Sequence, residues 1–168
     1  ETALFDAVAE EVQVTIDDTG GVGLGLFVDL EEDFEEIDGG FTHGGAGDCW
    51  EWGAPTSGPG YATSGSNVWA TRLAGDYPPS ASMWLDAPPV AIGLASTAPV
   101  LSFRHYYSGE CCCDYASVQV SVDGSAHVDL PGIQGNSGNR FYCNATGGSY
   151  ALVTFDLAAY RGHTLGFR

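Results

Sequence analysis

The sequence predicts an all-β fold, a jelly-roll β-sandwich of about eight or more strands. Short apolar runs recur along the 168 residues, and 24 glycines and 8 prolines separate them. Strands joined by turns produce this pattern. No run reaches the roughly 18 apolar residues of a transmembrane helix, so we expect no membrane insertion. A chain of this length supports one core, so residues 11–168 are predicted to form a single domain after an N-terminal arm at 1–10.

Individual strands are predicted from alternation and from the turn residues that flank them. Residues 12–16 and 24–28 form an expected hairpin, and the other strand candidates are 68–73, 82–86, 100–107, 117–122, 150–157 and 164–168. In 100–107, alternation puts Leu101, Phe103, His105 and Tyr107 on one face, which predicts that His105 lies in or just below the core. The acidic stretch 29–38 is too densely charged for a buried strand, and 39–66 is predicted to be a long structured loop.

Charge limits the function classes. The formal charge is −17, with five arginines and no lysine. Nucleic-acid binding needs a basic surface, so we expect cations rather than nucleic acid as partners. Without lysine there is no P-loop and no Schiff base. The sequence also has no H-E-x-x-H or G-x-S-x-G motif, and its four histidines do not cluster, so we expect a protein without enzyme activity.

The five cysteines are Cys49, Cys111, Cys112, Cys113 and Cys143. Their spacing fits no zinc or redox motif, which favours disulfides and therefore a secreted or cell-surface location. Two bridges would leave one thiol free, buried or bonded to another molecule. We expect no bridge between adjacent cysteines, because their Cα atoms are closer than in relaxed disulfides. A soft-metal cluster is the alternative.

Six segments in order carry a family resemblance: EDFE (32–35), WEWGAPTSGPG (50–60), SGSNVWATRLAGDY (64–77), LSFRHYY (101–107), VQVSVDG (118–124) and VTFDLAAYRGHTLGFR (153–168). Together they cover most of the chain, which resembles the MAM-like jelly-roll domains of secreted bacterial proteins, including metallopeptidases of the immune inhibitor A type. Such domains usually close with a strand like W-Y-I-D-D-V. Here the similar segment VTIDD (14–18) stands at the front instead.

We therefore expect the N-terminal segment, through Val12, Val14 and Ile16, to supply the closing strand. It can fold back into its own domain or enter a neighbouring molecule. The second arrangement is head-to-tail and builds rings or filaments of the chain with itself.

The resemblance also implies a structural calcium ion. Calcium takes six to eight oxygen ligands from carboxylates and carbonyls. The first candidate ligands are Glu35, at the acidic corner, and Asp17, in the closing strand. Asp18 and Asp33 are second candidates, and Asn67 can add an oxygen. The alternative is that these acids are solvated surface charges without an ion.

The tryptophans have two interpretations. Trp50 and Trp52 share one side of an extended segment and are a candidate glycan-stacking platform, whereas core packing is the ordinary use of large aromatic residues. Three functions stay open: a self-assembling extracellular structural protein, a glycan-binding accessory module, and a passive calcium-stabilised domain of a larger secreted peptidase.

Overall fold

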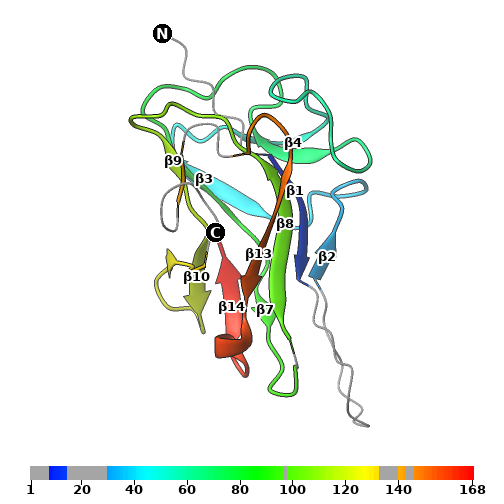
Figure 1. The fold of residues 1–168 in the computed structure, drawn as a ribbon, viewed down its shortest axis with the longest axis vertical. Helices are drawn as coiled ribbons and strands as arrows, with labels where there is room; N and C mark the ends of the chain where they lie inside the picture. The colour runs from blue at the N-terminus through cyan, green and yellow to red at the C-terminus, as the bar shows by residue number, and fades with distance from the viewer. Residues whose placement is uncertain (1–7, 15–29, 97, 133–139, 143–145) are drawn as a thin grey trace.

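The computed structural model describes residues 8–14, 30–96, 98–132, 140–142 and 146–168, with the backbone alone at 8–14 and 142. Fourteen strands make up this part of the chain, arranged in packed layers (Figure 1). The helical content described is one three-residue 3-10 turn, Ala158–Tyr160, and no helix there is long enough to cross a membrane. The prediction of an all-β sandwich is confirmed.

The first layer is a six-stranded sheet in the order β13-β8-β1-β5-β4, with β2 also paired to β1. All of its pairings are antiparallel. The strands are β1 (Val8–Val14), β2 (Leu30–Glu32), β4 (Trp50–Gly53), β5 (Val68–Thr71), β8 (Val100–Tyr106) and β13 (Ala151–Asp156).

Strand β1 joins the two halves of this sheet. One of its edges pairs with β8, and the other pairs with β5 at Val8 and Ala9 and with β2 from Val12 to Val14. The register against β8 shifts between Ala9 and Glu11, which marks a β-bulge. Among the described residues β8 and β5 are not paired directly, and β1 connects them.

Strand β1 includes part of the expected N-terminal arm. Its described residues run from Val8 to Val14, so Val8, Ala9 and Glu10 belong to the strand. Strand pairing on both edges outweighs the weak helical spacing of the first residues, because sheet formation depends on neighbours more than on local preference. Val12 and Val14 lie in β1 of their own domain, while Ile16, Asp17 and Asp18 fall outside the described residues.

The second layer is a four-stranded sheet in the order β11-β10-β14-β7, with two strand pairs, β12-β9 and β3-β6, as separate sheets. The main-chain nitrogen of Ala87, just after β6, donates to the carbonyl of Phe167 in β14 at 3.0 Å and links these sheets. The bounds are β3 (Thr42–Ala46), β6 (Ser82–Asp86), β7 (Val90–Ala91), β9 (Tyr115–Ala116), β10 (Gln119–Val122), β11 (Val128–Asp129), β12 (Phe141–Tyr142) and β14 (Thr164–Phe167).

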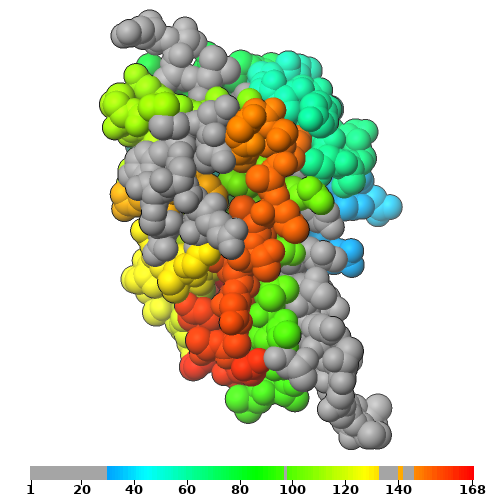
Figure 2. All heavy atoms as spheres, in the orientation of Figure 1, coloured from blue at the N-terminus to red at the C-terminus, as the bar shows by residue number. Residues whose placement is uncertain are grey.

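The core fills the space between the layers. Leu101 and Phe155 of the first layer, and Val120 and Leu165 of the second, are at most 1% exposed and belong to one cluster. The predicted inner face of β8 is confirmed, since all four of its residues are buried and His105 is 7% exposed. Figure 2 shows β13 (orange to red) beside the green start of β8, with the yellow segment around β10 and β11 nearby.

The acidic stretch agrees with expectation, whereas the glycine-rich region does not. Part of the acidic stretch forms β2, whose residues are half-buried or exposed rather than buried. Residues 39–66 contain β3 and β4 rather than one long loop. Strand β3 carries no apolar alternation: a Cβ on Gly45 would lie 2.3 Å from the carbonyl oxygen of Ser82, so close pairing with β6 requires glycine there.

Candidate functional site

The acidic corner begins with a strained residue. Phe34 is fully buried and has a φ of 60°. This left-handed backbone conformation is energetically unfavourable for any residue other than glycine. Neighbouring groups hold it there. The amide of Phe34 donates to Glu32 at 2.9 Å, the amide of Glu35 donates to Asp33 at 3.1 Å, and the Trp52 indole donates to the Phe34 carbonyl at 2.8 Å.

This corner directs Glu35 at the loop before β5. Oε1 of Glu35 accepts the amides of Ser66 at 2.8 Å and Asn67 at 2.7 Å, and the Asn67 side chain donates to the Glu35 carbonyl at 3.3 Å. Gly65 is at a φ of 58°, and a Cβ on it would lie 2.3 Å from Cδ of Glu35. The loop therefore needs glycine to close on the carboxylate.

The predicted metal ligands are partly brought together. Glu35, Asp33 and Asn67 lie at one corner, and their oxygens are of the hard type that calcium takes. Asp17 and Asp18 lie outside the described residues. Strand β1 passes beside this corner, where its neighbour changes from β2 to β5. Val12 lies opposite Glu32 of β2, and Ala9 lies opposite Trp69 of β5. Glu10 and Glu11 are the residues of β1 between these two pairings. The sequence analysis missed these two acids as candidates.

We expect Glu35→Ala to lower the free energy of unfolding by about 1–3 kcal/mol, because two main-chain amides lose a charged acceptor. Glu35→Gln should cost less, since it keeps an acceptor oxygen. Urea unfolding followed by circular dichroism measures both. Glu36→Ala is the matched control, because Glu36 is exposed. Equal midpoints for Glu35→Ala and Glu36→Ala would mean that the bonds to Ser66 and Asn67 contribute no stability.

The cysteines depart from expectation at one point. Cys112 and Cys113 are bridged to each other, with Cα atoms 3.7 Å apart, although no bridge between neighbours was expected. They lie in an exposed turn in which the amides of Cys113 and Asp114 both point to the carbonyl of Glu110, and this turn directs the adjacent side chains toward each other. Cys111 is also disulfide-bonded, and Cys143 lies outside the described residues.

Cys49 is the free thiol of the described residues. It is half-buried, 3.7 Å from the Met83 sulfur, and burial raises its pKa. The soft-metal alternative can be compared with the described residues. There, Glu110, Cys112 and Cys113 lie close enough together to hold a metal ion. The two sulfurs are bonded to each other, however, so they are not the thiolates that a soft metal binds.

The tryptophans pack on the core. Trp69 is 4% exposed, and Trp50 and Trp52 are half-buried against the main cluster. The face of Trp84 is covered by the guanidinium of Arg168, 4.6 Å from the ring centre. A glycan-stacking role for Trp50 and Trp52 stays a prediction.

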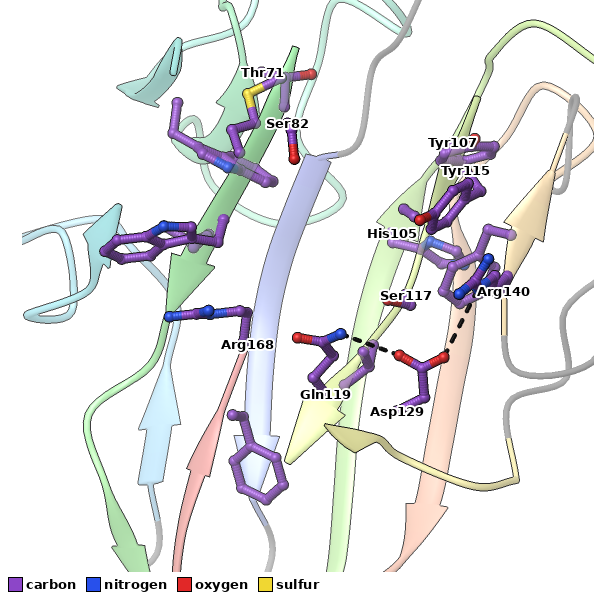
Figure 3. A pocket seen from close by; sticks show the side chains of 18 of the residues that line it. Thr71, Ser82, His105, Tyr107, Tyr115, Ser117, Gln119, Asp129, Arg140 and Arg168 are labelled. Carbon is purple, nitrogen blue, oxygen red and sulfur yellow. Dashed lines mark hydrogen bonds and ion pairs between the residues drawn. The ribbon is translucent and has the colours of Figure 1, made fainter. Parts of the chain in front are cut away.

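A groove of about 640 Å³ opens over the inner face of β8. Its floor includes Leu101, Phe103 and His105, and its walls are β6 on one side and residues 115–119 on the other. Figure 3 shows Ser82 on the first wall, Ser117 and Gln119 on the second, and Arg168 at one end. A groove this size is in the range of ligand sites.

The two arginines that line the groove are each paired with an aspartate. Arg140 lies 3.7 Å from Asp129, and Arg168 forms two bonds, of 2.7 and 2.9 Å, with Asp86. Tyr77 donates to Asp114 at 2.5 Å, and burial followed by this bond raises the pKa of Tyr77. Burial lowers the pKa of His105 to about 4, so its imidazole is neutral at pH 7. Its ring contacts are with Phe103 and Phe141.

Fold and site together define an all-β sandwich domain with one acidic corner and one apolar groove. The chain is 33% identical over 135 residues to Bacillopeptidase F of Bacillus subtilis (strain 168). This match covers 80% of the chain and 9% of that protein. No family model matches the chain, and no solved structure does. The similarity is to a small region of a protein named as a peptidase, and the finer MAM-like assignment stays a prediction.

Proposed function

We propose that this chain is a non-catalytic accessory domain of a secreted peptidase. The observation that carries the proposal is the match with Bacillopeptidase F, in which 80% of the chain corresponds to 9% of a much longer protein. A segment of that size fits an accessory domain beside the catalytic part of a longer protein. The sequence supports the same role, since it lacks lysine and the common hydrolase motifs.

Replacement in the relative tests this role. In Bacillopeptidase F, we expect the matching region to be dispensable for turnover of a short peptide and needed for turnover of a large protein substrate. Substituting the present chain for that region should restore the second activity. Loss of short-peptide turnover in a folded deletion variant, or hydrolysis by the purified present chain, would contradict the proposal.

We also propose that calcium binds at the Glu35 corner, with Asp33 and Asn67 supplying further oxygens and with Glu10, Glu11, Asp17 and Asp18 as the acids available from the N-terminal segment. The geometry supports this by gathering oxygen donors from two separate loops. Bound calcium would neutralise part of the net charge of −17 and tie the 32–35 corner to the loop before β5.

Calcium is expected to raise the melting temperature, because a ligand that binds only the folded state stabilises it by mass action. Differential scanning fluorimetry in calcium and in chelator measures the effect. Glu35→Gln should abolish the difference between the two conditions, and Glu36→Gln should keep it. An unchanged melting temperature in chelator would reject the site.

Self-assembly is a second candidate function. It would use the slot between β8 and β5, which β1 of the same chain fills in this structure and which the same strand of a neighbouring copy would also fit. In that case the chain would form head-to-tail filaments, visible by electron microscopy and lost when a peptide of residues 8–18 is added in excess. A protein that sediments as a monomer at all concentrations would reject this candidate.

A further inference from the structure

The turn before β9 carries a disulfide of an unusual kind. Cys112 and Cys113 are neighbours in the chain and are bonded to each other. A bridge between neighbours closes no loop of intervening residues, so it removes little conformational freedom from the unfolded chain. Its contribution to stability is therefore small. Both cysteines are exposed, in the turn drawn yellow-green at the upper left of Figure 2, and exposed disulfides are open to exchange with other thiols.

An acid lies beside the two sulfurs. The carboxylate of Glu110 and the Sγ atoms of Cys112 and Cys113 all lie within 4.8 Å of one another. Sulfur and carboxylate ligands together suit zinc and related cations, whereas calcium takes oxygen ligands. Zinc binds thiolate sulfur at about 2.3 Å, so two thiolates on one tetrahedral zinc ion stand about 3.8 Å apart. Once the bond between the sulfurs is broken, such a separation fits within the span of this group.

The turn is held by contacts that do not involve this bridge. The amides of Cys113 and Asp114 donate to the carbonyl of Glu110, at 3.5 and 3.4 Å, and close the turn. Tyr77, which belongs to the core, donates to the carboxylate of Asp114 at 2.5 Å and fixes the end of the turn. At the other end, Cys111 has a disulfide of its own. We therefore expect the three ligands to stay together when the bridge is reduced, as a preorganised set.

We propose that Glu110, Cys112 and Cys113 form a redox-gated binding site for a divalent cation of the zinc class. In the oxidised chain the site is closed, because the two sulfurs are bonded to each other. A dithiol reductant opens it, and the two thiolates and the carboxylate then bind the cation, which keeps one tetrahedral position for water. This site is independent of the calcium proposal, whose ligands are all oxygens, and of the accessory role.

The gating step is a thiol–disulfide exchange. One thiolate of the dithiol attacks the sulfur of Cys112 or Cys113, the bond between these sulfurs breaks, and a mixed disulfide forms. The second thiolate of the dithiol attacks the mixed disulfide, and the reductant leaves as a cyclic disulfide. The reductant loses two electrons, and the two cysteines gain two electrons and two protons. Binding of the cation then releases both protons, so one Zn²⁺ replaces two H⁺ at the site.

Reduction and cation binding are coupled. A cation that binds only the reduced chain stabilises that chain by mass action. In a buffer with a fixed ratio of reduced to oxidised dithiothreitol, free zinc at about ten times its dissociation constant should raise the ratio of reduced to oxidised site about elevenfold. Alkylation of the thiols followed by mass spectrometry measures this ratio. Calcium at the same free concentration is the control and should leave the ratio unchanged.

Cadmium titration of the reduced 168-residue chain tests binding directly. Dithiothreitol opens the bridge, the reductant is removed without air, and the protein mass and thiol count show that Cys112 and Cys113 are reduced. Cadmium–thiolate bonds absorb in the ultraviolet, so the titration measures both the dissociation constant and the number of ions bound. We expect a single cadmium ion per chain, displaced by zinc, and no comparable absorption in the oxidised chain.

Paired variants identify the ligands. Replacement of both Cys112 and Cys113 by serine should abolish the cadmium absorption, whereas Cys49→Ser, which removes the free thiol of the described residues, should keep it. Glu110→Gln should weaken cadmium binding by about tenfold or more, because a neutral amide replaces a charged ligand. Glu36→Gln is the control, since Glu36 is an exposed acid outside the turn, and it should bind like the unchanged chain.

Four results would overturn the proposal. They are the absence of cadmium–thiolate absorption in a folded chain with the bridge open, equal binding by the double-serine variant, equal binding by Glu110→Gln, and a bridge that opens only when circular dichroism shows an unfolded chain. Where the double-serine variant does not fold, the reduced chain with both thiols alkylated takes its place. The accessory role is measured by peptidase turnover in the relative, so either proposal can fail while the other stands.

Discussion

Removal of residues 1–14 is expected to leave a chain without a cooperative unfolding transition. In the part of the chain that the structure describes, strand β1 is the connection between the β13-β8 and β5-β4 halves of the main sheet. Without it, the main chains of β8 and β5 lose their partners on facing edges, and each unpaired buried group costs about 1–3 kcal/mol. Because β1 pairs with three strands, several such groups lose their partners at once. Their summed cost is comparable to the roughly 5–15 kcal/mol of stability typical of a domain.

Thermal unfolding by circular dichroism measures this result. A peptide of residues 8–18, added to the truncated chain, should restore the transition by refilling the slot. Gln13→Pro is a smaller perturbation of the same strand, since it removes a main-chain donor where β1 pairs with both β2 and β8. Gln13→Thr keeps the donor and should unfold like the unchanged chain. A truncated chain that melts as before would show that β1 does not hold the sheet together.

The second large effect is a loss of stability between pH 6.5 and pH 4. His105 has a folded-state pKa of about 4 against an ordinary value of 6.5, because burial disfavours the imidazolium. Below pH 6.5 the unfolded chain binds a proton that the folded chain does not, so stability falls as pH falls. The loss is complete near pH 4 and amounts to about 3 kcal/mol at most, since one pKa unit corresponds to about 1.4 kcal/mol.

Urea unfolding at half-unit steps of pH measures this slope. His105→Phe should flatten it over the same range, because the titrating group is gone and an aromatic ring still fills the site. His127→Gln is the control, since it removes a histidine outside the core, and it should keep the slope. A slope that is the same in His105→Phe would assign the acid sensitivity to other groups.

Alternation predicted most strands because it reports burial directly. The run from Val100 to Tyr107 places every second side chain in the core, and the β6 range 82–86 coincides with the observed strand. Strands without that signal were missed. In β3, glycine is required by close backbone approach to β6, and the partner that creates the requirement is distant in sequence.

One of the two candidate sites could be predicted from the sequence and the other could not. The family resemblance pointed to Glu35 and to the loop at Asn67, because the segments that carry it include EDFE (32–35) and SGSNVWATRLAGDY (64–77). The groove was not foreseen, since the residues that line it are far apart in the sequence and only the fold brings them together. The start of β1 was placed too late, because the bulge between Ala9 and Glu11 breaks the simple period before Val12.

The central place of β1 also has a kinetic consequence. Its longest partner, β8, lies about 90 residues later in the chain, so the main sheet cannot close until β8 is available. Folding that depends on such distant pairing is slow, and the unfilled edges of β8 and β5 stay open to unwanted partners in the meantime. We therefore expect refolding from denaturant to be limited by the pairing of β1 with β8, and to give more correctly folded protein at low protein concentration.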